Sequence, residues 1–160
     1  MTKTDLRPFT GQDLDWLVAP HVEHYAAEEG FDASFGDLVA EILDAFIADH
    51  DPQDEAGWIA WQDGQRLGSI FCVRLDERRA KLRLFLLMPK ARGQGLGRRL
   101  LEVCTDFARA KGYTGMQLWT HESHAAACAL YRRNGWRMTE ERAVTSFGRA
   151  LIEQTYRIDF

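Results

Sequence analysis

Hydrophobic side chains recur along this chain in two distinct periods, and the change from one period to the other predicts its secondary structure. A period of three to four residues is typical of helices that bury one face, whereas short apolar or alternating runs are typical of strands. The helical pattern covers residues 14–25, 35–47, 96–108 and 124–134. The strand pattern covers residues 6–9, 58–61, 66–75, 80–88, 116–119, 136–142 and 154–160. The resulting order, β-αα-βββ-α-β-α-ββ, indicates an α/β (α+β) fold with a mixed central sheet and helices on its faces.

Residues that favour turns and helix ends stand between these segments. Thr10 and Asp13 have the spacing of a capping box, and Ser34 and Ser123 are the predicted N-caps of the second and fourth helices. Asp63-Gly64 is typical of a tight hairpin turn. The other predicted stops are Glu29-Gly30, His50-Asp51-Pro52, Pro89, Lys111-Gly112 and Gly135. No repeat or linker interrupts the pattern, so we expect a single domain over residues 1–160.

The composition narrows the class of protein. Of the 160 residues, 46% are hydrophobic and 28% charged, with a formal net charge of −4, which is a globular composition that disfavours a nucleic-acid partner. No apolar run approaches the roughly 18 residues that span a bilayer, so no membrane association is expected. No apolar segment follows Met1–Asp5 as it would in a signal peptide. Cys72, Cys104 and Cys128 are too separated for a disulfide framework or a metal site, which favours a cytoplasmic protein with buried thiols and no metal.

The candidate chemistry lies between residues 84 and 101, where a predicted strand runs through a glycine-rich loop into a helix. Gly93, Gly95 and Gly97 let the backbone turn with positive φ and let a ligand approach closely. Unpaired N–H groups and the helix dipole at that point attract phosphate, and Arg92 and Arg98 add positive charge. The GxGxG spacing differs from the dinucleotide GxGxxG pattern, and no Gly-Lys-Ser/Thr ending follows. A glycine turn with only a structural role is the alternative.

Two motifs in this segment and beyond it resemble the GCN5-related N-acetyltransferase family. Arg92-x-x-Gly95-x-Gly97, with Pro89 three residues before the arginine, is similar to the acetyl-CoA motif of that family. Residues 126–136, which include Tyr131 and Gly135, are similar to its A-x-x-x-Y-x-x-x-G-F segment. The resemblance covers almost the whole chain and implies the family's fold. More narrowly, residues 81–84, 146–148 and 154–156 resemble acetyltransferase domains that are fused to MarR-type regulators.

The resemblance implies acetyl transfer from acetyl-CoA and assigns roles to individual residues. Backbone groups of Phe85, Leu86 and Leu87 would bind the pantetheine arm and polarise the thioester carbonyl. Tyr131 matches the general acid that protonates the departing thiolate, with packing beside the helix as its alternative role. The residues expected to bind the pyrophosphate or lie beside it are Arg92, Gly93, Gln94, Gly95, Leu96, Gly97 and Arg98.

Two positions differ from the pattern of the family. His124 stands where the family often has an asparagine that contacts the cofactor, and an imidazole can also donate a hydrogen bond there. Trp119 stands where the preceding strand often carries a catalytic glutamate, so the base must come from elsewhere or act through water. The candidate bases are Glu122, Glu77, Asp76, Glu23, His21 and His24, of which Glu122 is favoured because it lies just before the helix of Tyr131.

The acceptor is expected to be a primary amine of a small molecule or peptide that attacks acetyl-CoA directly. The first two helices would wall its site, so His21, His24 and Tyr25 are candidate contacts, with Trp119 at the border of the pocket. Packing is the alternative role of His21 and Trp119. The negative net charge favours cationic acceptors. Edge strands near the C-terminus could pair two copies in a homodimer. The alternative function is that of a CoA-binding sensor or regulatory protein without transferase activity.

Overall fold

The computed structural model describes residues 4–160, and a seven-stranded sheet forms the centre of this part of the chain. Residues 1–3, part of the segment in which no signal peptide was expected, lie outside the described residues. The strands are β1 (Asp5–Pro8), β2 (Ala56–Gln62), β3 (Gln65–Arg74), β4 (Arg79–Leu87), β5 (Gly115–His121), β6 (Arg137–Ser146) and β7 (Arg149–Asp159). The helices are α1 (Leu14–Glu29), α2 (Ala33–Asp49), α3 (Leu96–Ala110) and α4 (Ala125–Arg133), with short 3₁₀ turns at Gly11–Asp13 and Pro89–Ala91.

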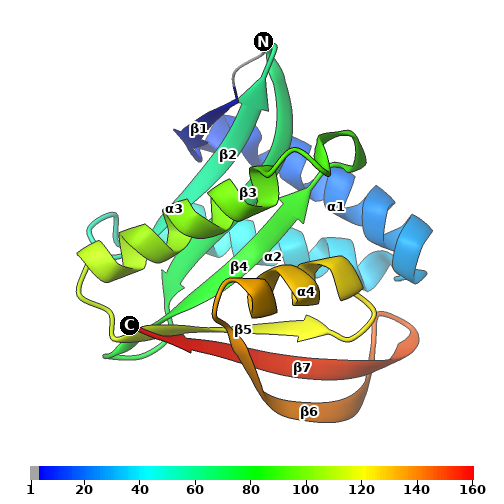
Figure 1. Cartoon of the computed structure of the whole chain (residues 1–160). Helices are drawn as coiled ribbons and strands as arrows, with labels where there is room; N and C mark the ends of the chain where they lie inside the picture. The colour runs from blue at the N-terminus through cyan, green and yellow to red at the C-terminus, as the bar shows by residue number, and fades with distance from the viewer. Residues whose placement is uncertain (1–3) are drawn as a thin grey trace.

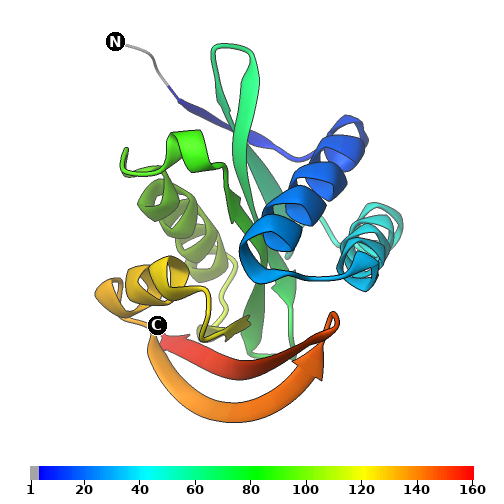
Figure 2. The same cartoon turned by 90° about the vertical axis from the view of Figure 1, so that its right-hand side faces the viewer.

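The sheet is mixed and lies between two layers of helices. Its strand order is β1-β2-β3-β4-β5-β7-β6, and every neighbouring pair is antiparallel except β4 and β5. Figure 1 shows α3 and α4 in front of the sheet, and Figure 2 shows that α1 and α2 cover the opposite face. The predicted element order and mixed α/β architecture are confirmed.

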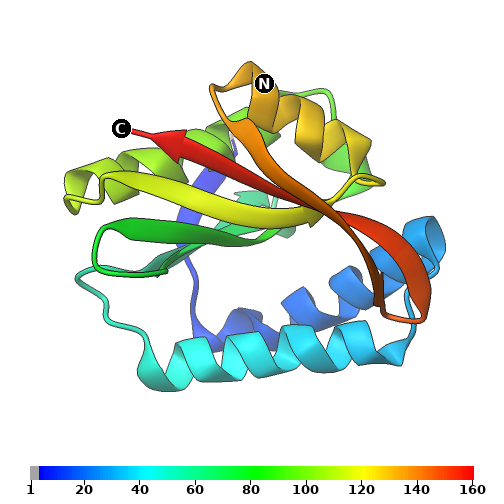
Figure 3. The same ribbon diagram turned by 90° about the horizontal axis from the view of Figure 1, so that it is seen from below.

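Each helical layer has its own hydrophobic core against the sheet. The apolar face of α3, with Leu100 and Cys104 fully buried, packs on β3, β4 and β5. On the other face, Val39 and Leu43 of α2 pack with α1 against β2 and β3. In Figure 3, α1 and α2 run along one side of the strands. The three cysteines are free and buried, as predicted. None of the helices in residues 4–160 is long and apolar enough to cross a bilayer.

Several predicted turns are confirmed, and two predicted caps are wrong. Asp63 and Gly64 have φ of 51° and 72°, the two positive values that a type I′ hairpin turn requires. The N-cap of α2 is Asp32 rather than Ser34, because the Asp32 carboxylate accepts a hydrogen bond from the Ser34 N–H at 3.0 Å. Helix α4 starts from His124 rather than Ser123, because the His124 N–H first closes a turn onto the carbonyl of His121.

The closing hairpin is longer than predicted. Strands β6 and β7 meet at Phe147-Gly148, where both residues have positive φ (53° and 75°). The carbonyl of Phe147 accepts a hydrogen bond from the Asp32 N–H at 3.0 Å, and its ring lies 4.8 Å from that of Phe31 and 5.0 Å from that of Phe35. The tip of the β6–β7 hairpin therefore packs against, and is hydrogen-bonded to, the turn between α1 and α2.

Candidate active site

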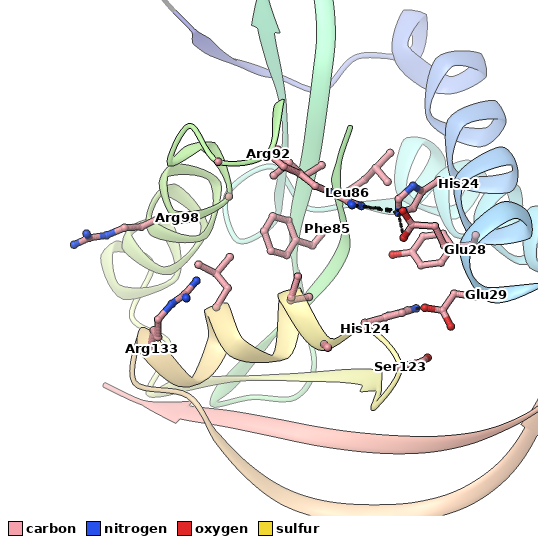
Figure 4. A pocket seen from close by; sticks show the side chains of 18 of the residues that line it. His24, Glu28, Glu29, Phe85, Leu86, Arg92, Arg98, Ser123, His124 and Arg133 are labelled. Atoms are coloured by element: carbon pink, nitrogen blue, oxygen red, sulfur yellow. Dashed lines mark hydrogen bonds and ion pairs between the residues drawn. The ribbon is translucent and has the colours of Figure 1, made fainter. Parts of the chain in front are cut away.

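A cavity of about 760 Å³ lies where β4 ends, between the start of α3, the start of α4 and the end of α1 (Figure 4). Its walls come from four segments that are far apart in the sequence. The lining residues are His24, Tyr25, Glu28 and Glu29; Phe85, Leu86 and Leu87; Arg92, Gly93, Gly95, Gly97 and Arg98; and Ser123, His124, Ala125, Ala126, Ala127, Leu130, Arg133 and Asn134.

Strand β4 forms one wall of this cavity because it separates from β5. The parallel ladder ends at the pair Lys81–Gln117, although β4 continues to Leu87 and both strands are fully described. On its other side β4 has a bulge, where Leu84 has φ of 49° and its carbonyl accepts a hydrogen bond from the buried Ser69 hydroxyl at 2.7 Å. A bulge changes the direction of a strand. Residues 85–87 therefore line the cavity with a backbone edge that pairs with no strand of the described chain.

The glycine-rich loop forms a cradle for an anion at the start of α3. Gly93 and Gly95 have φ of 78° and 75°, and a Cβ added at either position would meet no atom within 4 Å. Helix α3 begins at Leu96 without a side-chain cap, so its first N–H groups have no partner within the helix. Arg92 and Arg98 line the same cavity. Unpaired N–H groups, the helix dipole and two cations together fit a pyrophosphate.

Tyr131 lies on α4 directly behind the cavity wall. It is 4% exposed, and its ring centroid is 6.1 Å from that of Phe85 and 5.8 Å from that of Tyr156. Its neighbours Ala127 and Leu130 line the cavity, although Tyr131 itself is not among the lining residues. Burial raises the pKa of Tyr131 well above its ordinary value, and Tyr25 adds to the rise. The phenol therefore keeps its proton at neutral pH, so it can donate that proton but cannot serve as a base.

The opposite end of the cavity carries histidines and acids. His124 Nε2 lies 3.5 Å from Glu29 Oε1, and the Glu29 side chain is only 11% exposed. This nitrogen is enclosed and has no hydrogen-bond partner among the described residues. Burial lowers the pKa of His124 to about 4, against the opposing effect of Glu29, so the imidazole is neutral at neutral pH.

A second acid, Glu28, ties the end of α1 to the glycine-rich loop. Glu28 contacts His24 Nε2 at 3.3 Å and Arg92 at 3.4 Å, as the dashed lines of Figure 4 show. Tyr25 lies between these groups and His124, and its ring centroid is 4.9 Å from the imidazole. Burial, followed by the charges of Glu29 and Glu28, raises the pKa of Tyr25 to about 12. Arg92 thus compensates the charge of Glu28, whereas no lysine or arginine of residues 4–160 forms an ion pair with Glu29.

Most of the predicted site residues meet in this cavity. Those that line it are Phe85, Leu86, Leu87, Arg92, Gly93, Gly95, Gly97, Arg98, His124, His24 and Tyr25. Gln94 and Leu96 belong to the same loop without lining the cavity. The Gln94 amide donates a hydrogen bond to the carbonyl of Lys90 at 3.2 Å, and Leu96 is buried in the core.

Three further predicted residues lie outside the lining. His21 is buried in α1 with its Nδ1 bonded to the carbonyl of Leu17 at 2.6 Å, which places it in the packing role given as its alternative. Trp119 is 39% exposed on β5 and lies under the ammonium of Lys81. Glu122 is exposed at the end of β5, with its backbone N–H bonded to the carbonyl of Ile152.

Several residues that line the cavity were not predicted from the sequence. Arg133 and Asn134 lie inside the second motif, so their position in that motif was a usable signal. The sequence pattern predicts Glu29 only as part of the helix stop Glu29-Gly30, and it predicts no role for Glu28. No local pattern could place them in the site, because the fold alone brings the end of α1 beside the start of α4.

A family comparison decides the identity of the chain. The model described as the acetyltransferase (GNAT) family matches residues 15–136, which cover the loop, α4 and most of the sheet. The chain belongs to the GNAT acetyltransferase family. This member of the GNAT family is 30% identical to N-acetyltransferase 8F1 of Rattus norvegicus over 108 residues, which cover 64% of this chain and 49% of that protein. The chain thus spans about half the length of the curated relative that it matches.

Solved structures agree on the fold of this GNAT acetyltransferase. A GNAT acetyltransferase of Staphylococcus aureus Mu50 superposes with a TM-score of 0.81 at 16% identity, covering 98% of this chain and 99% of that one. The yncA protein of Salmonella typhimurium, solved with its cofactor acetyl-CoA, superposes with a TM-score of 0.73 at 18% identity, covering 98% and 94%. At these identities the likeness establishes the fold alone.

Proposed function

We propose that this acetyltransferase transfers the acetyl group of acetyl-CoA to a primary amine of a small molecule or peptide by direct attack. The observation that carries the proposal is the unpaired edge of β4, which leads through the 3₁₀ turn at Pro89–Ala91 to the anion cradle at the start of α3. A linear ligand with a diphosphate at one end fits this combination. Backbone groups of residues 85–87 would bind its amide-containing arm, and the loop from Arg92 to Gly97 would bind its diphosphate.

In the reaction, the amine nitrogen forms a bond to the acetyl carbon while the carbon–sulfur bond breaks and the sulfur leaves as a thiolate. The attacking nitrogen loses a second proton as it becomes an amide nitrogen, and this proton restores the phenol of Tyr131 after Tyr131 has protonated the thiolate. Unpaired N–H groups of β4 can stabilise the negative charge that develops on the carbonyl oxygen. Tyr131 is our proposed proton donor to the thiolate, because its buried phenol is protonated at neutral pH. A thiolate of pKa near 8.5 requires only a weak acid.

The acceptor amine is proposed to lie at the end of the cavity that carries Glu29 and His124. An alkylamine of pKa near 10 must lose a proton before attack, which costs about 4 kcal/mol at pH 7. Glu29 is a mostly buried acid that lines the cavity, whereas Glu122 is exposed outside it. We therefore favour Glu29 over Glu122 as the group that attracts the ammonium and receives its proton, directly or through water.

The proposal is tested by thiol release from acetyl-CoA across a panel of primary amines, with acetyl-CoA binding measured by calorimetry. Glu29→Gln should raise KM for the amine about 10-fold or more, because a charge-assisted contact is lost, and should leave acetyl-CoA binding unchanged. Glu23→Gln is the matched control, because Glu23 lies on the same helix but is exposed and outside the cavity. Equal KM values for the two variants would contradict the assignment of Glu29.

The alternative is a CoA-binding sensor without transferase activity. Acetyl-CoA binding without thiol release in the presence of any amine would favour it. The likeness to acetyltransferase domains fused to MarR-type regulators remains a prediction from residues 81–84, 146–148 and 154–156. A cytoplasmic location is also part of the proposal, which the three free, buried cysteines favour.

A further inference from the structure

Two cations stand side by side on the face of β4 that is turned toward α2. Lys81 and Arg83 are two residues apart in a regular stretch of strand, so their side chains leave the same face about 7 Å apart. Both side chains are half-buried. Lys81 lies over the ring of Trp119, with Nζ 4.5 Å from the centroid. Arg83 lines a second cavity of about 310 Å³, whose opposite wall is α2.

These cations have no anionic partner within residues 4–160. Neither side chain forms an ion pair or a side-chain hydrogen bond with another described residue. Burial, with repulsion by Arg83, lowers the pKa of Lys81 to about 8, and burial also lowers the pKa of Arg83. Partly desolvated charges of like sign are costly to hold together without a counter-charge. An anion bound between them would remove that cost.

On the face of the sheet that carries Lys81 and Arg83, the neighbouring strands of the described chain place no unpaired acid beside these two cations. Across the sheet, Lys81 is in register with Gln117 and then with Arg157, whose Nε is enclosed and has no partner among the described residues. The acids of this face on β7, Glu153 and Asp159, are already paired with Arg142 at 3.1 Å and with Arg137 at 2.8 Å.

Two acids line the second cavity, but neither contacts Arg83. Glu55 accepts hydrogen bonds from the N–H groups of Asp51 and Arg74, and Asp49 lies on α2. Arg83 therefore lines a cavity whose two acids it does not contact, and Lys81 lies next to Arg83 on the same face of β4.

The second cavity and the larger cavity of the proposed reaction site are lined by consecutive residues of β4. Arg83 and Leu84 line the smaller cavity, and the next residue, Phe85, begins the lining of the larger one. Because a strand rises about 3.3 Å per residue, Arg83 lies about 7 Å along β4 from Phe85, which is within the length of a small acceptor whose amine enters the larger cavity. The net charge of −4 favoured a cationic acceptor, but Lys81 and Arg83 are positive charges that no acid of residues 4–160 contacts.

We propose that Lys81 and Arg83 bind an anionic group of the acceptor, so that the substrate is an amine with a nearby carboxylate or phosphonate, of the amino-acid class. The inference rests on the proposed function and adds the chemical class of its acceptor. Lys81 and Arg83 position this substrate, and they take no part in the proton transfers.

The test compares amines that differ only in the anionic group. Acetylation is measured for the 20 amino acids, their carboxamides and the corresponding aminoalkylphosphonates, with wild type, Lys81→Gln and Arg83→Gln. The ratio of kcat/KM for an acid to that for its amide should fall about 10- to 100-fold in each variant, mainly through KM, because a charge-assisted hydrogen bond is lost. Differences in amine reactivity cancel when this ratio is compared between proteins. The phosphonates distinguish a carboxylate site from a phosphonate site.

Two further variants separate binding from a structural role. Lys111→Gln removes an exposed cation that lies over the ring of Phe107, remote from the second cavity, and should leave the ratio unchanged. Lys81→Arg should restore most of the preference, which a purely structural loss would not do. An equal acid-to-amide ratio in wild type, Lys81→Gln and Arg83→Gln would overturn the inference and leave the proposed function intact.

If no amine is acetylated although acetyl-CoA is bound, the proposed function is contradicted. Whether Lys81 and Arg83 bind an anion is then tested by calorimetric titration of the same acids and phosphonates into the CoA complex. Binding by wild type that Arg83→Gln loses would support the site, and absence of binding by wild type would overturn it.

Discussion

Replacing Gly95 by glutamate should abolish acetyl-CoA binding while the fold persists. Gly95 is the residue directly before α3, it lines the large cavity, and its φ is 75°. A side chain there would meet no protein atom within 4 Å of its Cβ, so it would extend into the open space of the anion cradle. The substitution therefore adds a negative charge at the place where a diphosphate would bind, without a clash inside the protein.

The expected size of the effect follows from two separate contributions. A non-glycine residue in the left-handed region costs about 1–2 kcal/mol of folding free energy, which most domains tolerate. At about 5 Å and an effective dielectric constant of about 20, Coulomb's law gives about 3 kcal/mol of repulsion for each facing pair of charges. This repulsion weakens binding by more than about 100-fold, from an expected low-micromolar Kd to one near millimolar.

Gly112→Glu is the matched control, because Gly112 has φ of 88°, also has open space around its Cβ, and lies at the other end of α3. Calorimetric titration with CoA gives the affinities, and urea unfolding gives the stabilities. Both variants should lose similar stability, but only Gly95→Glu should lose CoA binding. If Gly95→Glu binds CoA with wild-type affinity, or if Gly112→Glu loses as much CoA affinity, the diphosphate does not bind at the start of α3.

Two other predictions concern Tyr131 and His21. Tyr131→Phe keeps the packed ring and removes the proton donor. The single-turnover rate should therefore fall about 100-fold, with little change in the affinity for acetyl-CoA. A rate within about twofold of wild type would exclude the general-acid role. Burial lowers the pKa of His21 to about 4, so between about pH 6.5 and pH 4 the unfolded chain binds a proton that the folded chain does not. The free energy of unfolding should therefore decline as the pH falls through that range, by about 3 kcal/mol from this residue. In urea titrations, His21→Leu should make this decline with pH less steep. An unchanged dependence of the unfolding free energy on pH would refute the lowered pKa of His21.

Local sequence patterns predicted the parts of the molecule that depend on local interactions. The hairpin turn at Asp63-Gly64 and the helix stop at Gly30 follow from residues that tolerate positive φ, and the structure has both. The turn at Phe147 was missed because its conformation depends on a hydrogen bond and ring contacts with the α1–α2 turn, more than 100 residues earlier. A bulky aromatic residue is not a turn signal by itself.

The same distinction between local and long-range interactions applies to the candidate site. The wall formed by residues 85–98 is nearly continuous in sequence, so a motif could indicate it. Glu29 and His124 are 95 positions apart and meet only through the fold. Lys81 and Arg83 alternate with apolar residues, which is the ordinary pattern of a strand with one exposed face. Only the partial burial of that face and the absence of a counter-ion within residues 4–160 distinguish them from solvated surface charges.

The separation of β4 from β5 also bears on how the protein behaves at high concentration. An unpaired strand edge is normally a template on which a second molecule can add a strand, and such edges lead to aggregation. Here the edge lies inside the molecule, because Gly97 of α3 and Ala126 of α4 line the same cavity as Leu86. A narrow, flexible chain such as a cofactor arm can enter, whereas a strand of another folded protein would meet the helices first. The chain can therefore keep these hydrogen-bonding groups free for a ligand without offering them to a strand of a second molecule.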